Sequence, residues 1–375
     1  MALHENIRCF RVILLLLAGC AFLAPPPAYA ADEGGEMDAV AHTADGVYLD
    51  FAPFGTVELP RIFLRKDPWG LDVFSSTRSA LLSERYVIEH EEDGHAEVLH
   101  GEALHAAIEH HEHLYAKPQP VLGSMVLDLS ITRHLVFGLL AALITVAIFV
   151  TLARRYRRPE DRVSAPRGIF QNMFEALVVF VRDEIAQPCI GPKYRQFLPF
   201  LLTAFMFILC CNLMGLVPYA GAATSNISVT LTLAAFSFVV GQRRGSRAYW
   251  KHMFWPPGVP LPVKCLLAPI ELVSLFAKHF ALALRLFANM MSGSLLILSL
   301  IGIIFTINVL FGSLTATVVA PVGVAFTLFI SFIKIAVAFI HAFVFTLLSA
   351  IFFGMAVEEH HEDETHAEEQ PALAG

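Results

Sequence analysis

Five long apolar blocks constrain the fold of this chain more than any other feature. They cover residues 134–153, 197–217, 226–241, 265–310 and 318–357. A helix needs about 20 residues, at 1.5 Å each, to cross a hydrocarbon layer about 30 Å thick. Hydrophobic residues make up 56% of the 375 residues and charged residues only 16%, which is too apolar for a soluble domain. The sequence therefore predicts an all-α, polytopic membrane protein with five membrane helices in a domain at 131–357.

The last two blocks are too long to cross a membrane at right angles. A helix of about 45 residues is about 67 Å long, roughly twice the hydrocarbon thickness. We expect both helices to be tilted, bent or broken and to form a hairpin. A shorter segment at 170–185 is amphipathic and is expected to lie along the inner membrane surface.

The first 30 residues have the pattern of a secretory signal peptide. Arg8 and Arg11 precede the apolar stretch Val12–Leu23, and Ala28-Tyr29-Ala30 offers a small-x-small cleavage site. Two other interpretations stay open. Cys20 follows small residues, as in a lipoprotein signal, and the segment can also be an uncleaved first membrane helix.

Residues 31–130 would then form an exported N-terminal extension. Its first half is compatible with small strands or an interfacial helix. Its second half is histidine-rich, with rings at every fifth position: His90, His95, His100, His105 and His110. Histidine tracts can hold metal or buffer protons, but a five-residue step turns about 140° around a helix. We therefore expect a solvated segment and no metal site, and the cysteine spacing indicates none either.

Basic clusters set the expected orientation. They follow the first and third apolar blocks and comprise Arg154, Arg155, Arg157, Arg158, Arg162, Arg167, Arg243, Arg244, Arg247 and Lys251. Short loops rich in arginine and lysine stay in the cytoplasm. Five crossings then put the mature N-terminus outside and the acidic tail at 358–375 inside, which suits a bacterial inner membrane; an organelle reached by a processed precursor is the alternative.

The 265–310 block carries a polar stripe. Glu271, Lys278, Arg285 and Ser292 are spaced by sevens, and Asn289 follows one turn after Arg285, so they share one helical face. An arginine at membrane depth costs at least about 2.5 to 3.5 kcal/mol and cannot deprotonate to avoid the cost. The side chain either snorkels to the surface, pairs with Glu271 as a structural bridge, or requires some other compensation at membrane depth, which is the interpretation that we favour.

The last block repeats this construction, because Thr327, Lys334 and His341 are also spaced by sevens. Its polar stripe can therefore face the first. A lone histidine in an apolar helix is more often a packing residue than a proton relay, but a lysine on the same face makes the two roles about equally plausible.

Three motifs resemble subunit a of F-type ATP synthases. The most specific is Leu284-Arg285-Leu286-Phe287-Ala288-Asn289-Met290-Met291-Ser292-Gly293, preceded by Glu271 and Lys278. The stretches Cys211–Pro218 and Thr224–Thr232 resemble the family's second and third membrane helices, and His341–Leu348 resembles its last one. The resemblance covers about 130–360 and does not extend to residues 1–120.

The resemblance implies a proton-translocating stator subunit that is not itself catalytic. The arginine matching Arg285 would face carboxylates on a rotating ring of subunit c, with a peripheral-stalk subunit b among the other partners. Two half-channels would deliver and remove protons. By motif position, Asn289, Ser294, Lys334 and His341 would line the outer one, and Glu271 and Lys278 the inner one.

The sequence departs from the family at three of these positions. The family commonly has an ionisable residue where Ser294 stands, an acid or histidine where Lys334 stands, and glutamine where His341 stands. No acid remains in the outer part of this helix pair. We therefore hypothesise that His341 replaces the usual relay.

Two other functional classes stay open. A free-standing transporter or channel often shows paired internal repeats, and we see no second copy of the Arg285 helix. A membrane-tethered metal-binding protein would use the histidine tract, for which the five-residue spacing is poor. No phosphate-binding glycine-rich loop is present, so we expect no cofactor, and the charge distribution indicates no nucleic-acid partner.

Overall fold

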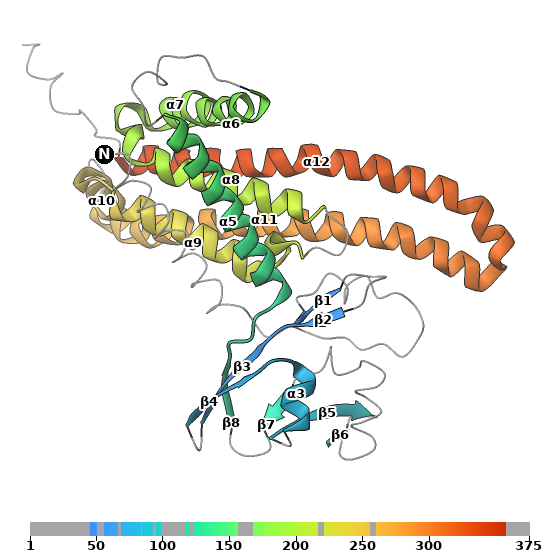
Figure 1. Cartoon of the computed structure of the whole chain (residues 1–375). Helices are drawn as coiled ribbons and strands as arrows, with labels where there is room; N and C mark the ends of the chain where they lie inside the picture. The colour runs from blue at the N-terminus through green and yellow to red at the C-terminus, as the bar shows by residue number, and fades with distance from the viewer. Residues whose placement is uncertain are drawn as a thin grey trace, which may run out of the picture. The chain divides into compact units, whose positions relative to one another are not determined.

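We analysed a computed structural model of the chain (Figure 1). It describes residues 46–50, 56–66, 69–83, 85–92, 95–98, 118–120, 124–156, 168–216, 221–255 and 260–357. The predicted signal peptide, the acidic tail, the basic residues 157–167 and the tract histidines His100, His105 and His110 lie outside these ranges. Two compact units are formed, one from 1–164, 206–233 and 283–342 and the other from 165–205, 234–282 and 343–375, and each is described by itself.

The N-terminal part of the first unit contains short strands. They form a β1–β2 hairpin and two three-stranded antiparallel sheets with the orders β4-β3-β8 and β6-β5-β7. One helix, α3 (Thr77–Leu82), is capped by the Ser76 side chain. The strands are β1 (Tyr48–Asp50), β2 (Thr56–Glu58), β3 (Arg61–Lys66), β4 (Gly70–Phe74), β5 (Tyr86–Glu92), β6 (His95–Val98), β7 (Pro118–Pro120) and β8 (Ser124–Asp128).

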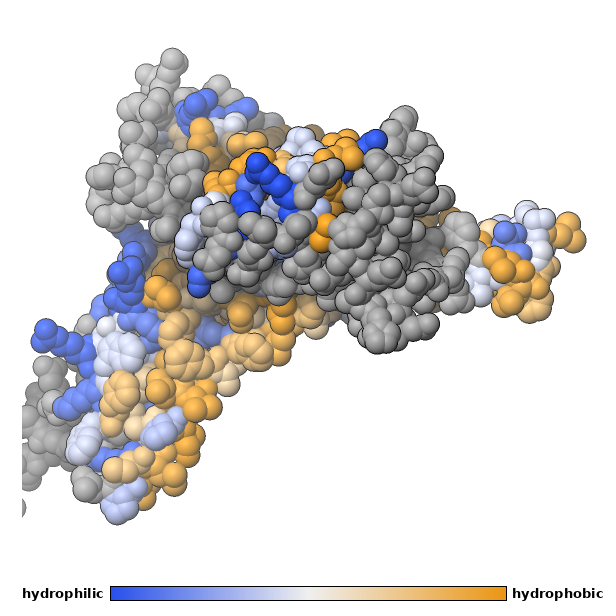
Figure 2. All heavy atoms as spheres, turned by 90° about the horizontal axis from the view of Figure 1, so that it is seen from below, coloured by the Kyte–Doolittle hydropathy of each residue, from blue (hydrophilic) through white to orange (hydrophobic). Residues whose placement is uncertain are grey.

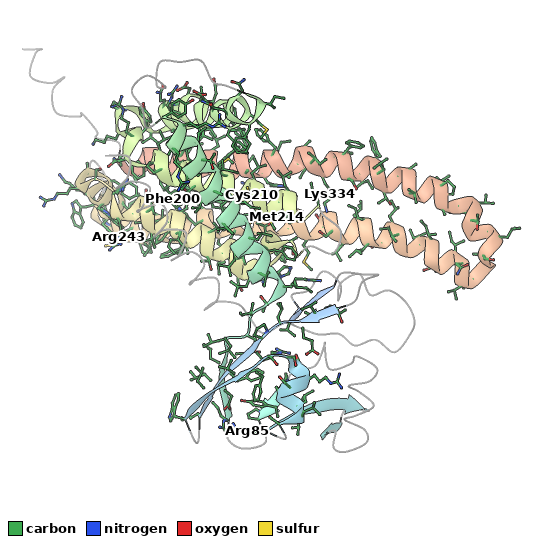
Figure 3. All side chains as sticks on the ribbon, in the orientation of Figure 1. Arg85, Phe200, Cys210, Met214, Arg243 and Lys334 are labelled. Atoms are coloured by element: carbon green, nitrogen blue, oxygen red, sulfur yellow. The ribbon has the colours of Figure 1, made fainter. Side chains whose placement is uncertain are left out.

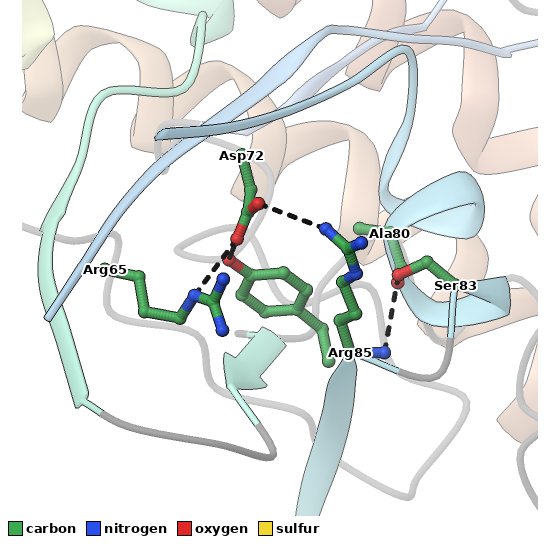
Figure 4. Close-up of polar contacts among 6 residues, drawn as sticks. Arg65, Asp72, Ala80, Ser83 and Arg85 are labelled. Carbon is green, nitrogen blue, oxygen red and sulfur yellow. Dashed lines mark hydrogen bonds and ion pairs between the residues drawn. The ribbon is translucent and has the colours of Figure 1, made fainter. Parts of the chain in front are cut away.

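The core of this strand region is aromatic. The rings of Phe63 and Tyr86 lie 4.7 Å apart, and Phe74 meets Tyr86 edge-on at 5.5 Å. The Tyr86 hydroxyl donates to Asp72 at 2.9 Å, and Arg65 and Arg85 both pair with the same carboxylate (Figure 4). One carboxylate thus gathers the polar ends of three side chains beside one apolar cluster.

The strand region leads directly into the first membrane helix, α5 (Arg133–Arg155). The Leu129 and Ile131 N–H groups donate to Ile62 and Pro60 carbonyls at 2.8 and 3.1 Å, and the Arg133 N–H donates to Gly46 at 2.7 Å. The Thr132 side chain caps α5 by accepting from the Leu135 N–H. Main-chain hydrogen bonds therefore continue from β8 to the first residue of the helix.

The rest of the described chain is helical. Three helices are long and apolar enough to cross a membrane, namely α5, most of α11 and α12, and two shorter apolar helices of 17 residues, α8 and α9, accompany them. The protein is a polytopic membrane protein whose membrane domain is all-α; five crossings remain a prediction. The bounds are α8 (Leu198–Met214), α9 (Ile227–Arg243), α10 (Arg247–Phe254), α11 (Leu261–Phe311) and α12 (Ser313–Val357), with the short helix η5 (Ala223–Ser225) between α8 and α9.

Helices α11 and α12, of 51 and 45 residues, are joined by the single residue Gly312. Its φ of 82° lies in the left-handed region, which glycine adopts without steric cost. A Cβ added at Gly323 would lie 2.9 Å from Ile304, so the two helices pack closely near the turn. Figure 2 shows apolar side chains over long stretches of the molecular surface, as expected of helices in contact with lipid.

The second unit has an aromatic core at the C-terminal end of α12. Phe353 stacks on Phe197 at 4.8 Å, and the hydroxyl of Ser237 on α9 donates to Ser349 on α12 at 2.9 Å. The segment expected at 170–185 is α6 (Ile169–Phe180) followed by a π-helical turn, η3 (Val181–Ala186), and by α7 (Gln187–Ile190) and η4 (Gly191–Gln196). Val181, Ile185 and Ala186 are fully buried, so the end of this segment packs inside the unit.

Candidate functional site

Helix α11 has a buried face and an open face around Arg285. Ala283, Leu286 and Met290 are 0%, 2% and 4% exposed, whereas Arg285 and Asn289 are exposed. Residues three or four apart on a helix share a face. Arg285 therefore lies on the exposed side of α11.

Arg285 has no acidic partner in the part of the chain that the structure describes. Neither the ion pairs of the strand region nor that of Arg182 with Asp183 involves Arg285. Glu271, the partner that the sequence allowed, makes no ion pair among these residues either. The internal salt bridge is thus not formed, and the positive charge stays open to an external partner.

Asn289 joins the two long helices. Its side-chain amide is hydrogen-bonded to Nε2 of His341 on α12, and His341 is only 7% exposed. Arg285, one turn before Asn289, also interacts electrostatically with His341. The structure therefore brings together three of the predicted site residues.

Lys334 lies against a glycine of the opposite helix. A Cβ added at Gly293 would be 3.0 Å from Lys334 Cε and 3.6 Å from its Nζ. Lys334 is half-buried, and Figure 3 shows it on α12 beside α11. The missing side chain at Gly293 thus makes room for the lysine stem between the helices.

Ser294 is on the same stretch of α11, but its hydroxyl is engaged by its own helix. It donates to the Met290 carbonyl at 3.0 Å. Thr327 on α12 does the same with the Gly323 carbonyl at 2.9 Å. Such bonds satisfy a hydroxyl in an apolar helix without a second partner, so Ser294 belongs to the site by position only.

Glu271 and Lys278 lie earlier on α11, in the other unit. Lys278 is exposed and Glu271 is half-buried. The neighbouring His279 is 6% exposed and has its Nδ1 at 3.0 Å from the Leu275 carbonyl. Its ring packs against Phe238 and Phe352, so His279 is a buried packing residue and not part of the polar stripe.

A buried polar network near His341 escaped the sequence analysis. Asn212 on α8 is fully buried, donates from Nδ2 to the Ala338 carbonyl at 3.2 Å, and accepts from the Thr224 hydroxyl at 2.8 Å. Ala338 is one helical turn before His341. One sequence feature could have predicted this network. Asn212 is the only side-chain amide in an otherwise apolar helix, where a polar group requires a partner.

A second polar pair lies at the start of α5. The Ser225 hydroxyl is 3.4 Å from Nε2 of His134, and both residues are buried. A Cβ added at Gly221 would lie 2.9 Å from the Arg133 side chain. The segment around η5 therefore packs tightly on the first turn of α5.

The ionisable side chains of residues 283–342 are Arg285, Lys334 and His341, and all three are basic. Histidine is the only one that normally gains and loses a proton near neutral pH. Among the described residues, no group of three histidine, cysteine, aspartate or glutamate side chains could hold a metal ion. The arrangement suits proton transfer beside a fixed positive charge.

Comparisons with known proteins identify the family. The sequence model of the ATP synthase A chain matches residues 135–354, which is more than half of the chain. The chain belongs to this family. The matched range contains the Asn289–His341 pair and Arg285, and it begins after the strand region.

Individual relatives agree with this assignment. An ATP synthase subunit a of Chloroherpeton thalassium is 42% identical over 335 residues, which are 88% of this chain and 80% of that protein. A subunit a 2 of Prosthecochloris aestuarii is 44% identical over 66% of this chain and 74% of its own length. A subunit a of Myxococcus xanthus is 40% identical over 67% and 81%. The first alignment is longer than the family's 135–354 range, so its similarity extends beyond that range.

Proposed function

We propose that this chain is the proton-translocating stator subunit of an F-type ATP synthase, coupling proton flow to rotation and ATP synthesis. The observation that carries the proposal is the state of Arg285. Its guanidinium lies on an open face of an apolar helix and has no carboxylate partner among the described residues. A permanent cation of this kind requires compensation, and family membership supports the kind of partner that supplies it.

The partner that we propose is the carboxylate of a rotating ring of subunit c. An opposite charge about 4 Å away is worth on the order of 4 kcal/mol at an effective dielectric constant near 20, or roughly three pKa units on a carboxylate. Arg285 would keep each passing carboxylate ionised. A protonated carboxylate could then not slip past the arginine, and net proton flow would require the ring to turn.

The outer half-channel of our proposal contains Asn289, Ser294, Lys334 and His341. Its support is the hydrogen bond between Asn289 and His341, the packing of Lys334 against Gly293, and the lack of acidic residues in 283–342. His341 would carry the proton, since histidine is the residue there that ordinarily gains and loses a proton near neutral pH. Glu271 and Lys278 would line the inner half-channel.

The chain is a multi-pass membrane protein, and the other subunits of an ATP synthase are its partners. We further propose subunit c and a peripheral-stalk subunit b as direct neighbours. The location would be a bacterial inner membrane, with the mature N-terminus outside and the C-terminus in the cytoplasm, because the basic clusters flank the first and third apolar blocks.

The test replaces Arg285 by alanine in the assembled complex. Inverted membrane vesicles should lose proton-driven ATP synthesis, because nothing then separates the two half-channels, while the purified complex should retain its subunits. Arg154→Ala, at the exposed end of α5, is the matched control and should retain synthesis. Wild-type synthesis by Arg285→Ala would refute the proposal.

Purification in mild detergent separates this function from that of a free-standing transporter. The chain should copurify with a carboxylate-bearing ring and a soluble ATPase head. A transporter would instead emerge alone or as a homo-oligomer.

A further inference from the structure

A strongly basic segment connects α9 to α11. Residues 234–270 contain five lysines and arginines and no aspartate or glutamate. Aromatic residues are interleaved with these cations, as in Arg247-Ala-Tyr-Trp-Lys251-His-Met-Phe-Trp255. We call the group Arg243, Arg247, Trp250, Lys251, Trp255 and Lys264 the α10 surface.

Helix α10 is fixed in place on its inner side. The Ser246 N–H donates to the Ala356 carbonyl of α12 at 2.8 Å, and the Ser246 hydroxyl caps α10 by accepting from the Tyr249 N–H at 3.0 Å. Met253 is 6% exposed. The helix therefore has a defined rotation, and its outward face is a consequence of the packing.

The outward face carries the charges. Arg247 and Lys251 are exposed and one helical turn apart. Phe254 and Trp255 follow, with 49% and 53% of their surfaces exposed. Arg243, at the end of α9, is also exposed and points away from the helices in Figure 3. These basic side chains form no ion pair with the acidic residues that the structure describes.

Aromatic rings lie next to the basic side chains of the α10 surface. Lys264 Nζ lies 4.7 Å from the centre of the Trp255 ring, and Trp250 stacks on Phe254 at 5.9 Å. Tryptophan rings prefer the level of the lipid headgroups, where one edge is apolar and the other is wet. The α10 surface thus combines interfacial aromatic residues with basic side chains that form no ion pair among the described residues.

We propose that the α10 surface binds the headgroups of anionic phospholipids in the adjacent membrane leaflet. Only three residues separate α9 from α10, and α11 begins at Leu261, so α10 stays close to the ends of two apolar helices. We expect the lipid to be an anionic phospholipid because its charge is complementary to this surface. Basic residues beside a membrane attract anionic headgroups more strongly than zwitterionic ones. This inference requires a membrane protein but does not depend on the proton path.

The test uses tryptophan fluorescence of the full-length chain in nanodiscs. The chain has three tryptophans, so Trp69→Phe leaves Trp250 and Trp255 as reporters. Phosphatidylcholine is replaced stepwise by acyl-brominated phosphatidylglycerol or by acyl-brominated phosphatidylcholine, because bromine quenches only rings in its immediate vicinity. At equal mole fraction, the brominated phosphatidylglycerol should quench more strongly.

Charge variants identify the residues responsible. A basic side chain near an anionic surface is worth about 1 kcal/mol, or about a fivefold preference. Arg247→Gln combined with Lys251→Gln should therefore reduce the preference for phosphatidylglycerol at least about fivefold. Lys193→Gln with Arg195→Gln, which removes the same charge from η4, should leave it unchanged. Arg247→Lys should also retain it, which guards against a folding defect.

Three results would overturn the proposal. Equal quenching by the two brominated lipids would show that headgroup charge is irrelevant. An unchanged preference in the double glutamine variant would assign the lipid contact elsewhere. Protection of both tryptophans from either lipid would mean that the α10 surface does not contact the lipid at all.

Discussion

Asn289 and His341 are hydrogen-bonded to each other across the two longest helices, although they are 52 residues apart in the chain. Asn289 is also one turn from Arg285, whose charge acts on the same imidazole. The contact therefore holds His341, the only histidine of residues 283–342, beside a permanent cation. The first prediction concerns what this imidazole contributes.

Replacing His341 should distinguish two roles of its side chain, relaying protons and positioning Asn289. His341→Ala removes both the proton carrier and the partner of Asn289, whereas His341→Gln keeps an amide that can bond to Asn289 but does not titrate near neutral pH. If His341 relays protons, both variants should lower proton-driven ATP synthesis in membrane vesicles roughly tenfold or more. Unchanged rates in His341→Ala would refute the relay, and full rescue by glutamine would leave only a positioning role.

Adding one methyl group at Gly293 should disturb Lys334. The new Cβ would lie 3.0 Å from Lys334 Cε, so the lysine stem must move. Gly302 on the same helix has nothing within 4 Å of its added Cβ, and Gly302→Ala is the matched control. Glycine-to-alanine replacement favours a helix by about 1 kcal/mol, so the control should not lose stability.

Proton-driven synthesis distinguishes these two glycine variants. Gly293→Ala should synthesise ATP several-fold more slowly than Gly302→Ala, because the displaced lysine disturbs the proposed outer half-channel. Equal synthesis rates in the two variants would show that the position of Lys334 has no influence on proton flow.

The buried Asn212 and Thr224 should be energetically coupled. Either Asn212→Leu or Thr224→Val leaves a partner without its hydrogen bond in a fully buried place, which costs about 1 to 3 kcal/mol. The double variant should lose less than the sum of the single variants, as read from thermal unfolding midpoints in detergent. Thr203→Val, whose hydroxyl bonds only within α8, should cost less. Strict additivity would contradict the coupling.

The sequence predicted the helices well because the signal is local. A run of about 20 apolar residues leaves a helix as the only way to satisfy its backbone in lipid. The observed helices begin within five residues of the expected blocks. The four-residue spacing likewise places Asn289 one turn from Arg285, since both lie on one helix.

Periodic sequence patterns do not predict which side chains of two different helices contact each other. Whether His341 meets Asn289 or Ser294 depends on how far α12 slides along α11, and packing at Gly293 and Gly323 sets that register. Asn212 was quoted only as part of a motif, since its partner Ala338 contributes a backbone carbonyl that no side-chain pattern reveals. The pairing of β3 with β8 could not be predicted either, because it is made by backbone groups of strands that are distant in sequence.

The last prediction concerns Tyr86 in the strand region. Burial, and then the hydrogen bond to Asp72 and its negative charge, raise the pKa of the Tyr86 hydroxyl well above its usual value. The raised folded-state pKa means that the stabilising contribution is complete below about pH 10, where tyrosine titrates in the unfolded chain. It should be lost progressively as the pH rises further towards the folded-state pKa.

Tyr86→Phe measures that contribution directly. With Trp250 and Trp255 changed to phenylalanine, the exposed Trp69 reports urea unfolding of the strand region in the full-length chain. At pH 7 the tyrosine form should be more stable than Tyr86→Phe by about 1 to 3 kcal/mol. Above pH 10 this difference should shrink by up to about 1.4 kcal/mol per pH unit. Asp72→Asn should reduce it already at pH 7, because the hydroxyl then loses its charged acceptor, and a difference that stays constant from pH 8 to pH 11 would contradict the assignment.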